Sequence, residues 1–150
     1  MKQSQTKILQ VGVKSLLLGK SNKVLILKRS SVKCGGIKQD DVWDIPGGRI
    51  NAGSSLASNL EREVFEETGI KRLKIIGLLG AQDIFHNEKH IVRLTYISRV
   101  TSDNVSLSEE HSEYKWVDID EVLRISNIDQ HLKAILKDKE VMSFIKDTLK

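Results

Sequence analysis

The chain contains very little cysteine and proline. It has one cysteine, Cys34, and one proline, Pro46, in 150 residues. A single cysteine forms neither an internal disulfide nor a cysteine metal cage, so nothing here requires an oxidising compartment and we expect a cytoplasmic protein. One proline and ten glycines exclude a collagen-like or proline-rich chain.

Long hydrophobic runs are absent as well. The apolar segment from Ile8 to Leu18 is interrupted by Lys14 and is far shorter than the ~20 residues that span a bilayer. The polar stretch before it has no signal-peptide pattern. The net charge of +4 is spread along the chain, without a recognition-helix pattern or clustered aromatics on basic strands. We therefore expect neither a membrane nor a nucleic acid as partner, and the charge favours small anionic molecules.

The length and the order of hydrophobic patterns predict one α+β domain. A chain of 150 residues is about one domain, so we interpret residues 1–150 as a single unit. Strand patterns come first, followed by a short helix, further strands and a helical tail. The expected strands cover residues 8–18, 23–29, 42–45, 74–85, 90–100 and 114–117, and the later helices cover 118–124 and 128–149. This order predicts three layers around a mixed sheet.

The first expected helix carries the clearest local signals. Apolar residues recur every four positions from Leu56 to Val64, which is helical spacing. Ser54 or Ser55 can cap its start, and Gly69 can end it in the left-handed conformation.

Three carboxylates lie on one face of this helix. Glu63, Glu66 and Glu67 stand at i, i+3 and i+4, and like charges at this spacing destabilise a helix, more so where solvent is excluded. Arg62 lies one turn before Glu66, but one guanidinium cannot balance three carboxylates. A hard divalent cation, Mg²⁺ or Mn²⁺, can. Taken by itself, the spacing also fits a solvated acidic face without a ligand.

The residues around this cluster resemble the signature of the Nudix hydrolases, the MutT-like enzymes that cleave nucleoside diphosphates linked to another group. The matching positions are Gly48, Arg62-Glu63-Val64, Glu66-Glu67, Gly69 and Ile70. The segment Trp43 to Gly48 resembles the strand and turn before the family's loop, and residues 8–125 fit its layout. The resemblance implies a Nudix fold, an α/β/α sandwich with a mixed β-sheet.

The resemblance also implies a metal site and a catalytic set. It suggests that the metal ligands are the Gly47 carbonyl and the carboxylates of Glu63, Glu66 and Glu67. A further glutamate is expected before a late strand as general base; Glu110 is the best match, and Glu113 is the alternative. The catalytic candidates are Glu110, Glu67, Arg62 and Arg49, with Arg62 expected to orient Glu66 or its neighbours.

Substrate contacts are expected at two places. Arg49 follows the paired glycines, where the family often has a basic residue that touches phosphate. Phe85 and His86 lie where a strand leaves the sheet, near the expected cleft. Trp43 and Trp116 are interpreted as core residues, although a Trp can also stack on a base.

One position departs from the family pattern. The glutamate expected there is Ser54, which has neither the charge nor the reach of a carboxylate. This leaves open a weakened site, a substitute carboxylate, or a nucleotide-binding or regulatory module with little turnover.

The expected activity is Mg²⁺-dependent hydrolysis of a pyrophosphate linkage in a nucleoside diphosphate derivative. The family's ADP-ribose subclass often has a proline about fifteen residues past the signature, but Pro46 lies upstream of it. A tyrosine that marks dinucleoside polyphosphate hydrolases is also missing from positions 86–88. These absences favour a nucleoside triphosphate, including an oxidised or noncanonical one. A monomer and a homodimer are both compatible with the sequence.

Overall fold

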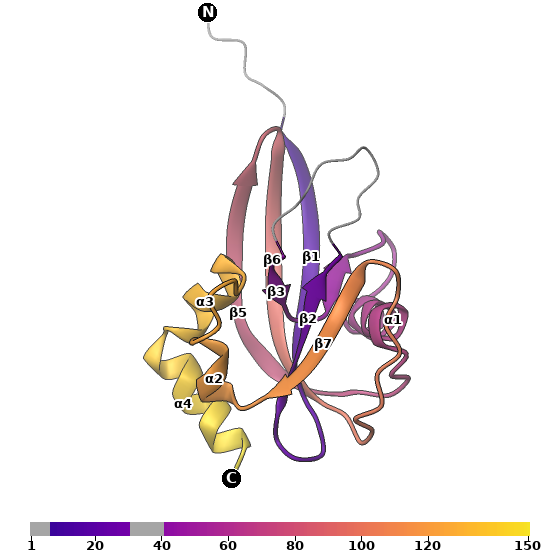
Figure 1. Cartoon of the computed structure of the whole chain (residues 1–150). Helices are drawn as coiled ribbons and strands as arrows, with labels where there is room; N and C mark the ends of the chain where they lie inside the picture. Colours follow the sequence, from indigo (N-terminus) through magenta and orange to yellow (C-terminus); the bar gives the residue numbers. More distant parts are fainter. Residues whose placement is uncertain (1–6, 31–40) are drawn as a thin grey trace, which may run out of the picture.

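The computed structural model describes residues 7–30 and 41–150 (Figure 1). Cys34 lies outside the described residues. The strands are β1 (Ile8–Leu18), β2 (Val24–Arg29), β3 (Trp43–Asp44), β4 (Gly47–Arg49), β5 (Lys74–His86), β6 (Lys89–Arg99) and β7 (His111–Val117). The helices are α1 (Leu56–Thr68), α2 (Ile119–Val122), α3 (Gln130–Leu136) and α4 (Lys139–Thr148).

The strands form one mixed sheet whose main order is β3-β2-β1-β6-β5. β1 runs parallel to β6, and the other strand pairs are antiparallel. On its other edge, β1 pairs with β2 only at Leu18 and with β4 at positions 12–14. β7 adds to the free edge of β2. The edge of β1 therefore pairs with two different strands, and β4 lies beside the middle of β1.

Helices cover both faces of the sheet. Figure 1 shows α1 on one side of the curled sheet and α2, α3 and α4 on the other. Each face of the sheet has its own hydrophobic core, and alternate residues of β1 pack into each. Val13 and Leu17 pack on the α1 side, while Leu16 and Leu18 pack on the side of the C-terminal helices. This division follows from the two-residue period of a strand. The expected α/β/α sandwich with a mixed sheet is confirmed.

The helix signals read from the sequence are confirmed at both ends of α1. Ser55 is the N-cap, because its Oγ accepts a hydrogen bond from the N–H of Ser58 at 3.0 Å. Gly69 ends the helix with φ 74°, and its N–H donates to the carbonyl of Phe65. Leu60 and Val64 are fully buried, each contributing ~1.5–3 kcal/mol relative to exposure. These contacts fix the rotation of α1 against the sheet.

The single helix expected over residues 128–149 is wrong. The chain forms α3 and α4 instead, separated at Lys137 and Asp138. The Asp138 side chain accepts hydrogen bonds from the N–H groups of Glu140 and Val141 at 2.9 and 3.1 Å, which starts a new helix. Of the helices that the structure describes, none combines the length and apolar character needed to cross a membrane.

The glycines after Pro46 form a strand, which the sequence did not predict. Gly47 to Arg49 pair with β1 as β4. Gly47 has φ 148°, and a Cβ there would collide with the carbonyl oxygen of Val13. Only glycine allows this close approach, and glycine-rich segments carry little strand signal of their own.

Candidate active site

A cleft of about 1050 Å³ lies between segments from distant parts of the chain. The start of β1, all of β4 and the end of β5 contribute to its walls. Residues 109–111 before and at the start of β7 and residues 129–131 at the start of α3 also line it, as do Glu67, residues 29–30 at the end of β2, and Ile91 and Arg93 of β6. The cleft exists only when the whole sheet is assembled.

Glu67, at the end of α1, is the buried carboxylate of the cleft. It is 5% exposed, and its Oε2 accepts a hydrogen bond from the N–H of Gly47 at 3.3 Å. Burial above all, with the carboxylates of Glu63 and Glu110, raises its pKa to about 7. Lys14 and the Gly47 N–H act against this without cancelling it. Within residues 7–30 and 41–150, no cation pairs directly with Glu67.

Glu110 and His111 meet Glu67 across the cleft. Ligand atoms of the three side chains all lie within 4.8 Å of one another. Burial, together with the positive charges of Lys14 and Arg29, lowers the pKa of His111 to about 4, so the imidazole is neutral near pH 7. His111 had not been singled out from the sequence, although it directly follows Glu110.

This group of residues fits a divalent cation. The buried Glu67 carboxylate lacks a compensating charge, and Nδ1 of His111 is buried without a hydrogen-bond partner in the described part of the chain. Carboxylate oxygens are the ligands that Mg²⁺ and Mn²⁺ prefer, and a neutral imidazole can add a nitrogen. Glu67, Glu110 and His111 could therefore hold a metal ion.

The other two signature carboxylates are held by Arg62. Its Nη1 lies 2.8 Å from Glu63 Oε1 and 3.3 Å from Glu66 Oε2, and its Nη2 donates to the Arg49 carbonyl at 3.0 Å. The Glu63 carboxylate lies so close to Gly48 that a Cβ at that glycine would be 2.5 Å from its Oε2. Of the carboxylate trio, only Glu67 lines the cleft; Glu63 packs against β4, and the Glu66 side chain is exposed.

The expected substrate contacts also reach the cleft. Arg49, Phe85 and His86 all line it, as does Gly47. Phe85 is 65% exposed, and its ring centroid lies 4.6 Å from that of His90. The cleft thus has an exposed aromatic ring at the end of β5.

The structure separates the two candidates for the general base. Glu110 lines the cleft, whereas the exposed side chain of Glu113 lies 4.0 Å from Lys28 and is not part of the cleft wall. Trp43 is buried in the core on the side of α2–α4, and Trp116 is partly buried on the α1 side. Both tryptophans therefore lie in the cores.

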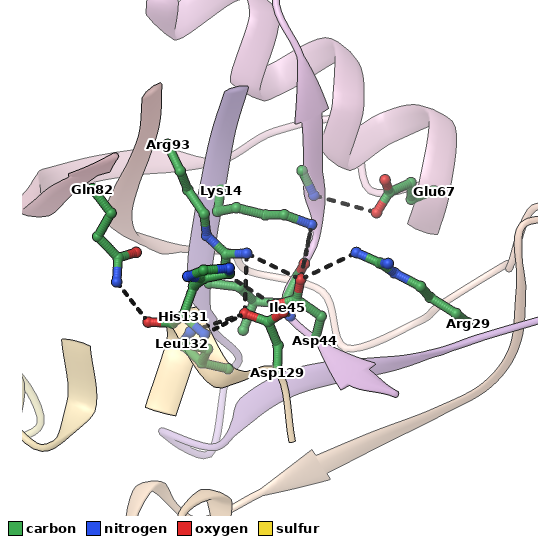
Figure 2. A network of polar contacts seen from close by, with 11 residues as sticks. Lys14, Arg29, Asp44, Ile45, Glu67, Gln82, Arg93, Asp129, His131 and Leu132 are labelled. Atoms are coloured by element: carbon green, nitrogen blue, oxygen red, sulfur yellow. Dashed lines mark hydrogen bonds and ion pairs between the residues drawn. The ribbon is translucent and has the colours of Figure 1, made fainter. Parts of the chain in front are cut away.

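A second charged cluster lies close to the cleft (Figure 2). Asp44, 2% exposed, is its centre: its carboxylate lies 3.2 Å from Lys14, 3.1 Å from Arg93 and 3.8 Å from Arg29. Arg93 also contacts Asp129 at 3.1 Å. Burial alone would raise the pKa of Asp44, but the charges of Lys14 and Arg93 and its hydrogen bonds lower it to about 2.

Three cations of this cluster were not expected at the site from the sequence. Lys14, Arg29 and Arg93 all line the cleft, so each can face an anionic ligand as well as Asp44. One signal was present: Lys14 is the single charged residue of β1, and Arg93 stands between the apolar residues Val92 and Leu94 in β6. A buried cation in a strand needs a buried partner, which only the fold can identify.

The fold and the site define a class of protein. The family model described as "NUDIX domain" matches residues 8–138, and the chain belongs to the Nudix family. Nudix hydrolases act on pyrophosphate bonds of nucleotides. The resemblance read from the signature residues is confirmed.

Individual relatives cover most of the chain. The crystal structure of a MutT protein from Methanosarcina mazei Go1 superimposes with a TM-score of 0.76 at 28% identity, covering 98% of this chain and 100% of that one. An 8-oxo-dGTP diphosphatase of Buchnera aphidicola is 28% identical over 127 residues, which are 85% of this chain and 91% of the relative. The asymmetrical bis(5'-nucleosyl)-tetraphosphatase of Rattus norvegicus is 28% identical over 101 residues, 64% of this chain and 68% of the relative.

Proposed function

We propose that this protein hydrolyses the pyrophosphate linkage of a nucleoside diphosphate derivative in a Mg²⁺-dependent or Mn²⁺-dependent reaction. One observation carries the proposal: a single cleft contains both an uncompensated buried carboxylate, Glu67, and a set of cationic side chains. A pyrophosphate group is polyanionic, so it needs positive charge around it, and carboxylates alone would repel it.

The proposed metal ligands are Glu67, Glu63, Glu66 and the carbonyl of Gly47, with Glu110 and His111 beside them. A bound Mg²⁺ or Mn²⁺ supplies neutralisation of phosphate charge and lowers the pKa of a coordinated water. Arg62 orients the carboxylates of Glu63 and Glu66 through its contacts at 2.8 and 3.3 Å. The ligands would then need little rearrangement during the reaction.

Glu110 is the proposed general base. It lines the cleft within 4.8 Å of Glu67 and His111, so it can accept a proton from a water between them and the substrate. His111 is neutral near pH 7, so it adds no positive charge beside this acceptor. The proton therefore has a nearby acceptor on the cleft wall.

The proposed phosphate contacts are Arg49, Lys14 and Arg29. All three line the cleft, and their positive charges favour the developing negative charge of the reacting phosphates. Phe85 and His86 are the proposed contacts for the nucleoside, because Phe85 offers an exposed ring at the end of β5.

The proposed substrate is a nucleoside triphosphate, including one with an oxidised or noncanonical base. The missing subclass residues favour this class, and the name of the Buchnera relative, 8-oxo-dGTP diphosphatase, supports it. The name of the rat relative, bis(5'-nucleosyl)-tetraphosphatase, supports dinucleoside polyphosphates as the next candidates. Ser54 supports the second candidate function, nucleotide binding with little turnover.

The test is a hydrolysis panel with purified protein. Nucleoside triphosphates, their 8-oxo forms, dinucleoside polyphosphates and ADP-ribose are incubated with Mg²⁺ or Mn²⁺, and phosphate and pyrophosphate release are measured. We expect metal-dependent release from a triphosphate that is lost in Glu67→Gln. Tight binding without release would favour the binding module, and neither binding nor release with any of these compounds would contradict both functions.

A further inference from the structure

The loop before α1 lacks the family's glutamate at Ser54, yet it is firmly attached to the helix. The attachment is the side chain of Asn59, which is 1% exposed. Its Nδ2 donates to the carbonyls of Ser54 and Ser55 at 3.2 and 2.7 Å. Its Oδ1 accepts from the N–H of Asn51 at 2.7 Å and from Nη2 of Arg62 at 3.0 Å.

These four contacts use the full hydrogen-bonding capacity of a carboxamide. A primary amide has two N–H donors and one oxygen with two lone pairs, and each of them has a partner here. A buried amide with every group satisfied is rigid, because any rotation of the side chain leaves at least one buried polar group unpaired. Asn59 therefore fixes the loop backbone and the Arg62 side chain at the same time.

Arg62 transmits this constraint to the carboxylates. One of its nitrogens contacts Asn59 and the Arg49 carbonyl, and the other contacts Glu63 and Glu66. The chain of contacts runs from the loop through Asn59 and Arg62 to two proposed metal ligands. Among the described residues, its hydrogen-bond partners are Asn51, Ser54, Ser55 and Arg62, none of which is a proposed metal ligand or part of the cleft wall.

We infer that Asn59 is a positioning residue that replaces the missing glutamate of the signature. It fastens the loop at positions 51–55 to α1 and orients Arg62, so that Glu63 and Glu66 are preset for a divalent cation. The replacement is a neutral amide on the helix instead of a carboxylate on the loop. The role of Glu63 and Glu66 rests on the proposed function, whereas the anchoring of the loop does not.

The first experiment compares the wild type with Asn59→Ala. Amide hydrogen exchange by NMR is measured at Asn51, whose N–H donates to Asn59, and Mn²⁺ affinity is measured by electron paramagnetic resonance. We expect exchange at Asn51 to accelerate about tenfold, since its hydrogen bond is lost. We expect Mn²⁺ binding to weaken by about 10–100-fold, the usual cost of removing an outer-shell partner.

The second experiment restores the family's carboxylate. Ser54→Glu is made both in the wild type and in Asn59→Ala. The vacated side of Arg62 then has a carboxylate partner again, and we expect the double variant to regain Mn²⁺ affinity to within about threefold of the wild type. In the wild type Asn59 already occupies Arg62, so Ser54→Glu alone is expected to have a smaller effect than in the Asn59→Ala background.

Asn22→Ala is the matched control. Asn22 also accepts from an arginine, Arg99, at 2.7 Å and donates to a backbone carbonyl, that of Leu149, at 3.2 Å, but it lies outside the cleft wall. Its φ of 61° means that alanine there is strained, so this variant lowers the melting temperature. We expect Mn²⁺ affinity and Asn51 exchange to stay at their wild-type values.

The outcomes separate this inference from the proposed function. Unchanged Asn51 exchange and Mn²⁺ affinity in Asn59→Ala would overturn the positioning role, whatever the activity. Equal losses of Mn²⁺ affinity in Asn22→Ala and Asn59→Ala, or no rescue by Ser54→Glu, would overturn it too. If the variants behave as expected but no nucleotide is hydrolysed, the positioning role stands and the proposed function fails. A wild type that binds no Mn²⁺ contradicts the proposed function, and Asn51 exchange then decides the anchoring role.

Discussion

Two buried carboxylates near the same cleft are in opposite electrostatic states. Asp44 contacts Lys14, Arg29 and Arg93, and its pKa is lowered to about 2. Glu67 accepts one backbone hydrogen bond, and its pKa is raised to about 7 (Figure 2). Burial penalises the charge of both groups, so the difference comes from their partners. The protein's own cations stabilise Asp44, and Glu67 is left for a cation from solution.

The largest expected effect comes from removing the charge of Glu67. In Glu67→Gln, hydrolysis should fall by about 10³-fold, since several kcal/mol of metal-derived charge stabilisation are lost. The free energy of unfolding of the metal-free protein at pH 8 should instead rise by about 1–3 kcal/mol, because an uncompensated buried charge disappears. Steady-state kinetics with Mg²⁺ and urea unfolding with a chelator measure the two effects. A Glu67→Gln protein that is less stable than the wild type would show that Glu67 is already compensated.

Asp44→Asn should have the opposite effect on stability. Lys14 would lose its ion pair and Arg93 would keep only its pair with Asp129, so the free energy of unfolding should fall by about 3–5 kcal/mol. The ion pairs of Asp44 also predict that the protein loses stability in acid. Because the pKa of Asp44 is lowered in the folded state, its contribution is complete above pH 3.8 and is lost as the pH falls from 3.8 towards 2. Urea unfolding of both proteins at pH 7 and between pH 2 and 4 tests this, and a loss below about 1 kcal/mol at pH 7 would contradict the assigned pairing.

Asp44 and Glu67 also show which features of the protein could be predicted from the sequence and which depend on the fold. The strands of the sheet and the start and end of α1 follow from local patterns, namely apolar residues every two or four positions, a serine cap and a terminal glycine. Helical spacing likewise identifies Glu63, Glu66 and Glu67 as one cluster. It cannot say which of the three is buried, because that depends on the contact of α1 with β4.

The partners of Asp44 lie beyond any local pattern. Arg93 is 49 positions away in the chain, on a strand that meets β1 only in the folded sheet. β4 was missed for a related reason, since the glycines that form it carry no side chains to produce an alternating pattern. Asn59 was overlooked because a polar residue on a helix gives no sign of burial until the loop folds over it.

The next largest expected effect is a difference in activity between variants of Glu110 and Glu113, two glutamates of the same segment. Glu110 lies in the cleft near Glu67, whereas Glu113 is exposed beside Lys28. Glu110→Gln should lower kcat by about 10²-fold or more, as expected for a general base, with a smaller change in KM. Glu113→Gln should change kcat by less than about twofold, because an exposed pair at 4.0 Å contributes little. Equal losses in both variants would mean that the segment acts through its fold and not through the carboxylate of Glu110.

The smallest expected effect is the pH dependence of metal binding, and it tests the difference between Glu67 and Asp44 most directly. Glu67 holds a proton below about pH 7, so a cation must displace that proton. Affinity for Mn²⁺ should rise by about fivefold between pH 6 and 7, by about twofold more between pH 7 and 8, and level off above pH 8. Asp44 is charged and His111 neutral throughout this range, so neither adds to the slope. Calorimetry in two buffers of different ionisation enthalpy should detect close to one proton released at pH 6 and almost none at pH 8. Binding at pH 6 without proton release would mean that Glu67 is ionised before the cation arrives, and the two carboxylates would then differ only in their partners and not in their protonation.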